Sequence, residues 1–466
     1  MRRSGSLPAE EARQAQFRKM TETPIPRLIS SLAVPTVITM MVSNIYNLVD
    51  TAFVGTLGTS ASGAVGIVFG FMAILQAIGF MFGQGAGSIL SRKLGARDID
   101  GASVTTSTGF FWSFCLGTVT AIICYLVIDP LIRFLGSTET IAPYAKTYIG
   151  YILITAPFAV SGFTLNNMLR YEGKAVFGMI GLMTGAVLNI GGDALLIFHF
   201  HMGIAGAGLS TAISQVVSFF VLLSAYLTGK TQSRLRFRMV SLHPAFVWDI
   251  AATGLPSLLR QGLNSISTIL LNSCAAVYGD ACVAGMSIVS RIFFFIFAVA
   301  IGVGQGFQPV SAFNYGAGKF SRVRQGMIFT CSASEVLMVI LGTGVFLGAP
   351  TLVRLMRDDP EVITIATRAL RLQCVSVIAL PPCMTAEMAM QSTGHKFSAS
   401  ILSMVRSGLL FVPCLLVLSA LRGLSGIQEA QPLAFFLSVP VSIVFLVWFY
   451  RSMPDADTVD AEGAGG

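Results

Sequence analysis

Two aspartates stand inside stretches of the chain that are otherwise apolar. Asp50 lies in "SNIYNLVDTAFVG" (43–55) and Asp193 lies in "VLNIGGDALLIF" (187–198). A carboxylate in the middle of a membrane-spanning helix costs ~2.5 kcal/mol or more on insertion scales, so such a residue needs a partner or a function. Two carboxylates close together in a low-dielectric helix bundle cannot both remain ionised and unpaired, so they either share a proton or hold a cation.

Polar side chains at helical spacing accompany both aspartates. Tyr46 precedes Asp50 by four residues and Asn189 precedes Asp193 by four, so each pair shares one helix face. Asp50 lies 22 residues beyond Leu28 and Asp193 lies 19 residues beyond Lys174, the residues at the cytoplasmic starts of their expected helices, which puts them at about the same depth. We therefore expect one site that contains both.

Hydroxyl groups near the starts of two further helices could complete this site. The predicted cation-binding and coupling cluster is Tyr46, Asp50, Tyr148, Asn189, Asp193 and Thr211. Four of these residues, Asp50, Asn189, Asp193 and Thr211, offer oxygen ligands of the kind that Na⁺ favours. The alternative for Thr211 and the tyrosines is ordinary: threonine often bonds its own helix, and tyrosine gathers at membrane interfaces.

Charged residues also occur in apolar stretches of the second half of the chain. Arg260, Arg291, Glu387 and Arg406 lie there. Glu387 could pair with Arg260 across a cavity or contact a substrate, and Arg291 is a further candidate for the wall of that cavity. A structural ion pair or side chains that reach the membrane surface are the alternative.

Composition identifies the elements that must position these residues. Of 466 residues, 54% are hydrophobic and 11% charged, and the mean hydropathy of +0.75 is that of a polytopic membrane protein and not of a soluble domain. A spanning helix needs ~20 apolar residues. Twelve stretches qualify: 28–52, 60–90, 103–128, 146–168, 176–198, 204–228, 246–277, 282–312, 326–348, 366–390, 400–420 and 432–450.

The distribution of basic residues predicts the orientation. If the N-terminus is cytoplasmic, the loops and tails on that side hold 20 Lys and Arg residues and the opposite loops hold 7, as expected when basic loops stay inside. We therefore expect both termini in the cytoplasm and residues 1–27 to be a retained tail without a signal peptide. Topology and anionic lipid explain the net charge of +8, so nucleic-acid binding is not expected.

An internal repeat divides the chain into two halves. An offset of 221 residues aligns Pro35 with Pro256, Gly58 with Gly279 and "GQG" at 83–85 with "GQG" at 304–306. Six helices per half give a parallel repeat, which is typical of transporters whose substrate path lies between the halves. The expected organisation is a tail (1–27), an N-lobe (28–228), a linker (229–245), a C-lobe (246–450) and a second tail (451–466).

The repeat extends to the loops, and it does not extend to the aspartates. Gly95 pairs with Gly316 and Gly173 with Gly394, and glycines with basic neighbours after long helices suit left-handed caps. The positions equivalent to Asp50 and Asp193 are Leu271 and Cys414. The predicted ion site therefore belongs to the N-lobe alone.

Other chemistries find little support. None of the eight cysteines forms a close pair with metal-ligand spacing, and the four histidines fall in loops and at helix ends. We therefore expect no enzymatic activity and no bound cofactor. A passive channel would need a filter-like motif in each half.

Several motifs resemble the multidrug and toxic compound extrusion (MATE) family, and its bacterial MepA-like branch in particular. The resemblance covers residues 25–450. It is carried by "VPTVITMMVSNIYNLVDTAFVGTLG", "GFMFGQGAGSILSRKLGARD", "LRYEGK", "LNIGGDALLIF" and "GVGQGFQPVSAFNYGAGK". This chain has Ala194 directly after Asp193, where many relatives have proline, and Arg260 in a motif where some relatives carry an acid.

The resemblance implies an all-α fold of twelve transmembrane helices in two bundles. It also implies an antiporter in the bacterial inner membrane that exports cationic amphiphilic drugs or dyes in exchange for Na⁺ or H⁺. The six residues of the cluster would be its coupling site, and we expect it to act as a monomer among membrane lipids. A flippase for lipid-linked saccharides, from the same wider superfamily, is the alternative.

Overall fold

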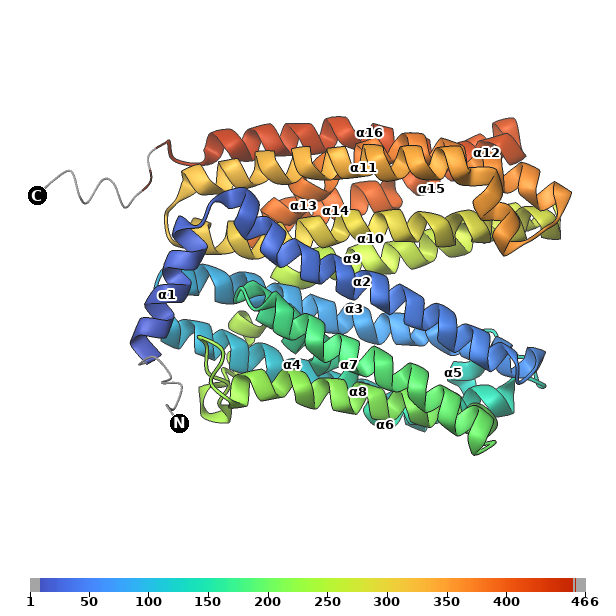
Figure 1. Ribbon diagram of the computed structural model, residues 1–466, viewed down its shortest axis with the longest axis horizontal. Helices are drawn as coiled ribbons and strands as arrows, with labels where there is room; N and C mark the ends of the chain where they lie inside the picture. The colour runs from blue at the N-terminus through green and yellow to red at the C-terminus, as the bar shows by residue number, and fades with distance from the viewer. Residues whose placement is uncertain (1–8, 456, 458–466) are drawn as a thin grey trace, which may run out of the picture.

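The protein is described by a computed structural model that covers residues 9–455 and 457, so parts of both predicted tails lie outside the described residues. All regular structure in the described part is helical, and the long helices lie side by side (Figure 1). The long helices of the first half are α2 (Ile25–Gly55), α3 (Thr59–Gly95), α4 (Ile99–Leu126), α6 (Ala142–Tyr171), α7 (Ala175–Asp193), which a π-helical segment (Ala194–His199) continues, and α8 (Gly203–Leu227).

The second half repeats this pattern. Its helices are α9 (Pro244–Ala276), α10 (Asp280–Gly316), α11 (Phe320–Met356), α12 (Pro360–Ser376) continued by α13 (Leu380–Thr393), α14 (Lys396–Met404) continued through a π-helical segment (Val405–Leu409) by α15 (Phe411–Arg422), and α16 (Leu424–Ser452). The shorter elements are α1 (Ala9–Glu22), α5 (Ile128–Phe134) and two 3₁₀ turns, Phe237–Met239 and Val377–Ala379.

Each of the twelve predicted spans overlaps one of these long helical segments. Within the described residues, eleven helical segments are long and apolar enough to cross a membrane. The exception is α9, which is 33 residues long and carries Asp249, Arg260 and many serines and asparagines. In the repeat it is equivalent to α2, which makes it the twelfth helix, and one of its polar residues, Arg260, pairs with the buried Glu387 of α13.

The two halves form separate bundles that contact each other mainly at one end. The first half, blue to green, and the second half, yellow to red, diverge away from the end at which both described chain ends lie (Figure 1). In the described residues, five hydrogen bonds join the halves, and all of them involve residues 20–23, 91–92 or 170 of the first half. We call this side of the molecule the closed end.

Glycines allow the helices to touch backbone to backbone at the closed end. A Cβ on Gly95 would lie 2.0 Å from the carbonyl oxygen of Phe313, and a Cβ on Gly316 would lie 2.0 Å from that of Arg92. These two contacts are related by the 221-residue offset, so α3 and α10 cross as a symmetric pair. After these two helices the left-handed residues are Arg97 (φ 60°) and Gly318 (φ 71°), and not Gly95 and Gly316, whereas Gly173 (φ 77°) and Gly394 (φ 91°) do adopt the expected left-handed conformation.

The segment between the halves is bound along the first half. Backbone N–H groups of Arg234 and Arg236 donate to the hydroxyls of Ser103 and Ser107 on α4, at 2.9 and 3.0 Å. The buried carboxylate of Glu172, just after α6, accepts from the backbone N–H of Gln232 at 2.8 Å and from the Ser233 hydroxyl. These contacts hold the segment against the first bundle, and its extent as a linker (229–245) stays a prediction.

Burial gives Glu172 an unusual titration. Removal of the carboxylate from water raises its pKa from 4.5 to about 7, although the hydrogen bonds from Ser233 and Gln232 act in the opposite direction. Because the folded protein holds this proton more tightly than the unfolded chain, the contribution of Glu172 to the free energy of unfolding falls as pH rises from about 4.5 to about 7. Replacement by glutamine should make the midpoint of thermal unfolding less dependent on pH in this window. An unchanged pH profile in Glu172→Gln would contradict the assignment.

The α3–α10 crossing predicts which glycine substitutions disturb the closed end. Gly95→Ala places a methyl group against a backbone carbonyl that cannot move aside, so we expect it to lower the free energy of unfolding by ~1–3 kcal/mol. Gly316→Ala should do the same. The control is Gly344→Ala, which meets nothing within 4 Å and should be neutral or slightly stabilising. Thermal unfolding of purified protein in detergent checks this, and equal stability of all three variants would contradict it.

Candidate functional site

The structure brings the six predicted residues of the first half together. Tyr46 and Asp50 lie on α2, Asn189 and Asp193 on α7, Tyr148 on α6 and Thr211 on α8. Helix α7 packs against α2 and α8, and α8 packs against α6. This helix arrangement closes a cluster from four segments that are distant in the sequence.

Contacts within the cluster link its members. The Asn189 amide donates to the Thr211 hydroxyl at 3.1 Å. The carboxyl groups of Asp50 and Asp193 lie close enough to act on one another, and Tyr148 lies within the electrostatic influence of both and next to Thr211. Tyr46 lies within the influence of Asp50. The two aspartates predicted at one depth are therefore neighbours.

The cluster contains more hydrogen-bond acceptors than protein donors. Asp193 is fully buried and Asn189 is 2% exposed. Both carboxylate oxygens of Asp193, Oδ1 of Asp50 and Oδ1 of Asn189 are buried and have no hydrogen-bond partner in the protein. Neither aspartate takes part in an ion pair among the described residues. Buried acceptors of this kind require a proton or a cation.

The donor set fits a small monovalent cation or a proton. It consists of two carboxylates with neutral amide and hydroxyl oxygens, which are ligands for a hard cation. Groups of three or more His, Cys, Asp and Glu side chains, which strongly bound divalent metals often use, do not occur in the part of the chain that the structure describes. Two negative charges can be balanced here by one cation and one proton, or by protons alone.

The backbone of α7 changes where the site lies. The α-helix ends at Asp193, and a π-helical segment starts at Ala194. Such segments occur often at functional sites because they widen the helix locally. The Ser210 hydroxyl donates to the Asn189 carbonyl at 2.9 Å and interacts with Asp193. Ser210, which directly precedes Thr211 on α8, was not among the predicted site residues.

A second buried cluster lies in the other half. Arg260 Nη1 on α9 lies 2.6 Å from Glu387 Oε1 on α13, and Arg406 Nη2, from the π-helical segment before α15, lies 3.2 Å from Glu387 Oε2. The side chains are 3%, 1% and 3% exposed for Arg260, Glu387 and Arg406. The suggested pairing of Arg260 with Glu387 does form, with Arg406 as a third member that sequence analysis did not assign to it.

Arg291 does not join this cluster. Its side chain on α10 is exposed, and it forms no hydrogen bond or ion pair with Arg260, Glu387 or any other side chain among residues 9–455. The fold therefore does not bring Arg291 into contact with Arg260 and Glu387, the residues with which it was grouped. Whether any of the three contacts substrate stays a prediction.

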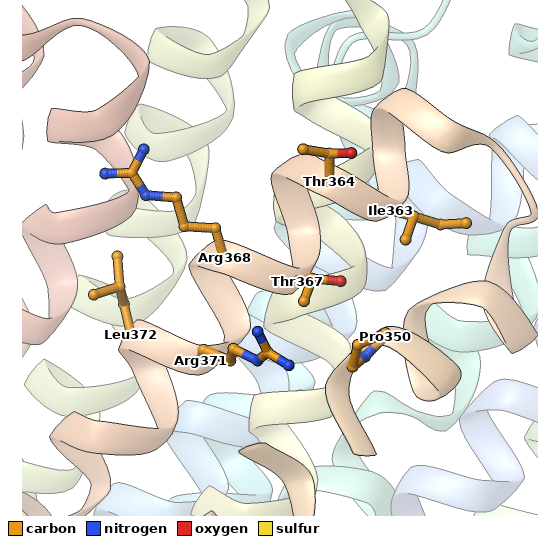
Figure 2. A pocket seen from close by; sticks show the side chains of 7 residues that line it. All are labelled: Pro350, Ile363, Thr364, Thr367, Arg368, Arg371 and Leu372. Carbon is orange, nitrogen blue, oxygen red and sulfur yellow. The ribbon is translucent and has the colours of Figure 1, made fainter. Parts of the chain in front are cut away.

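A pocket of about 450 Å³ lies away from both clusters (Figure 2). It is lined by Pro350, Ile363, Thr364, Thr367, Arg368, Arg371 and Leu372. Its arginines already have protein partners: Arg368 lies 3.6 Å from Glu429, and Arg371 lies over the ring of Phe346 at 5.3 Å. None of the predicted site residues lines this pocket.

The buried triad predicts a strong effect of removing its only acid. Glu387→Gln leaves two guanidinium groups buried without a carboxylate, so we expect a loss of ~3–5 kcal/mol in folding stability. Arg291→Gln is the matched control on the same half, and it should leave thermal stability unchanged because its side chain is exposed. Thermal unfolding in detergent distinguishes them, and a Glu387→Gln protein as stable as wild type would show that the triad is not an ion-pair network.

Comparison with known proteins supports the repeat and the fold. The MatE family model matches residues 35–195 and 256–416, and these two matches are offset by 221 residues. The chain is 28% identical over 411 residues to the multidrug export protein MepA of Staphylococcus haemolyticus, covering 87% of this chain and 90% of that protein. It is 25% identical over 444 residues to the Staphylococcus aureus protein of the same name, covering 95% and 98%.

A solved structure gives the same result for the fold. An outward-facing multidrug resistance MATE family transporter superposes with a TM-score of 0.88 at 24% identity, covering 93% of this chain and 98% of that one. The two repeated matches, the twelve long helices and the two bundles agree, and the chain belongs to the MATE family of membrane transporters.

Proposed function

We propose that this protein is a secondary active exporter that moves cationic amphiphilic compounds outward in exchange for Na⁺ or H⁺. The observation that carries the proposal is the adjacent pair Asp50 and Asp193, in which both carboxylate oxygens of Asp193 and Oδ1 of Asp50 are buried without a protein partner. A lysine or arginine at this position would neutralise the pair permanently. No such side chain pairs with either aspartate in the described residues, so the charge is left to be balanced by an exchangeable ion.

Coupling follows if ion binding favours one arrangement of the two bundles. A ligand shifts a conformational equilibrium only by its difference in affinity for the two states. Asp50 lies on α2, which packs against α7 of its own half and against α10 of the other half. Neutralisation of the pair would therefore change the packing of a helix that both bundles share, and so the preference between an outward-open and an inward-open state.

The direction of export follows from the proposed orientation. The closed end carries both described chain ends and most of the basic loops, and basic loops favour the cytoplasmic side. With the closed end in the cytoplasm of a bacterial inner membrane, the present arrangement is outward-facing. The relatives named as multidrug export proteins support small-molecule drugs as the substrate class. The protein would act as a monomer, since each chain contains both bundles.

Ethidium efflux from proteoliposomes tests the proposal. An imposed Na⁺ gradient or an imposed pH gradient should drive efflux by the wild type, and the effective gradient names the coupling ion. Asp50→Asn and Asp193→Asn should each reduce gradient-driven efflux by about tenfold or more, since one acceptor charge is lost.

Asp129→Asn is the control for this experiment. Asp129 pairs with Lys146 at 2.8 Å on the exposed surface, so its loss should leave efflux intact. Full gradient-driven efflux in both Asp50→Asn and Asp193→Asn would refute the coupling site. Lipid flipping without ethidium efflux would favour the flippase.

A further inference from the structure

Arg170 is a buried cation without an acidic partner. It lies in the last turn of α6 and is 4% exposed. Its Nη1 donates across the lobe interface to Oε1 of Gln305 at 2.5 Å, and its Nη2 donates to Oδ1 of Asn167 at 2.6 Å. Arg170 belongs to no ion pair in the described part of the chain, and its Nε is buried without a partner.

The neighbouring charges increase the free-energy cost of burying the Arg170 guanidinium. Besides the hydroxyl of Tyr171, the side chain of Arg260, another cation, lies close enough to act on Arg170, and a guanidinium does not lose its proton in a protein. Arg260 and Arg406 share the one carboxylate of Glu387. Arg170, Arg260 and Arg406 are thus three buried guanidinium groups with one buried carboxylate among them. This region, which spans both bundles, therefore has a formal charge of +2. A buried charge needs a counter-charge, which neutral amides and water do not supply.

A second unpartnered donor lies beside Arg170. The Tyr171 hydroxyl donates to Oε1 of Gln84 at 2.9 Å, and the Tyr171 ring lies 5.7 Å from Cζ of Arg170. Nε2 of Gln84, which is fully buried, has no partner in the protein. Tyr171 also lies within the influence of Arg92 and Arg260. The unpartnered atoms of Arg170 and Gln84, the two residues beside Tyr171, are therefore N–H donors within a positive region, which is the reverse of the Asp50 and Asp193 cluster.

We propose that the lobe interface beside Tyr171 binds a small inorganic anion, held by Arg170 and Gln84, with chloride as the first to test. The burial of both side chains favours a compact anion over the head group of an amphiphile. Because Arg170 also bonds Gln305 of the other half, the bound anion would stabilise the contact between the halves at the closed end. This inference does not depend on the proposed ion coupling at Asp50 and Asp193.

Thermal unfolding of the full-length purified protein tests the inference. Sodium chloride and sodium gluconate are compared at equal Na⁺ concentration, ionic strength and pH, so that Na⁺ binding cannot produce a difference. Chloride should raise the unfolding midpoint of the wild type by a few degrees, because a ligand that binds only the folded state stabilises it. Equilibrium dialysis with radiolabelled chloride should give one site per chain.

Variants locate the site. Arg170→Gln should abolish the chloride-dependent shift, and Gln84→Leu, which keeps every charge, should require about tenfold more chloride for the same shift. The control is Arg322→Gln, which removes another arginine at the closed end, one that bonds Asn314 and the Thr23 carbonyl. This variant should keep the full chloride response even if its stability is lower.

Three results would overturn the proposal. The first is a wild type with equal midpoints in chloride and gluconate and no bound radiolabelled chloride. The second is a chloride shift that persists unchanged in both Arg170→Gln and Gln84→Leu. The third is stabilisation by decyl sulfate in gluconate but not by chloride, which would assign the site to an amphiphile. If Arg170→Gln fails to fold, Gln84→Leu and the dialysis experiment still decide.

Discussion

A charge buried in the low-dielectric interior of a helix bundle must be matched, and this constraint orders the chemistry of the whole structure. The first bundle holds the fully buried Asp193 beside the partly buried Asp50, with no basic partner among residues 9–455, while the second buries Glu387 between Arg260 and Arg406. The first arrangement needs a counter-ion from outside the chain. In the second, the chain itself supplies the counter-charge of Glu387, with one arginine in excess.

The same scaffold therefore supports two different roles. The 221-residue repeat gives both halves equivalent helices, equivalent glycines and the equivalent glutamines Gln84 and Gln305. At the position of Asp50 the second half has Leu271, and at that of Asp193 it has Cys414. Duplication preserved the backbone contacts that hold the halves together, whereas the charged groups inside each bundle diverged. The proposed exchangeable site in one half and the internally paired triad in the other would give the two bundles different responses to ions.

Local patterns predicted much of the fold. The hydrophobic length of a span is a property of a single helix, and the repeat can be seen directly in the order of residues along the chain. The twelve spans and the pairing of Asp50 with Asp193 followed from spacing and depth alone. Two features could not be predicted in this way. Gly95 and Gly316 look like helix caps in sequence, and only the tertiary arrangement shows that they are where α3 and α10 cross. Arg170 looks like one more basic residue of a cytoplasmic loop in "LRYEGK", yet the long α6 keeps it buried against the other half.

Arg170 shows why buried charge is hard to predict from sequence. Counting basic residues assumes that an arginine near a helix end reaches water, which is usually correct because its side chain is long. At the closed end the neighbouring bundle occupies that space, and Gln305 of the other half accepts the hydrogen bond that water would otherwise accept. A separation of the halves at this end would expose Arg170 and break this bond. The electrostatic state of the interface is thus linked to its geometry, and an anion bound there would oppose opening of the closed end, while a cation at Asp50 and Asp193 would act through α2.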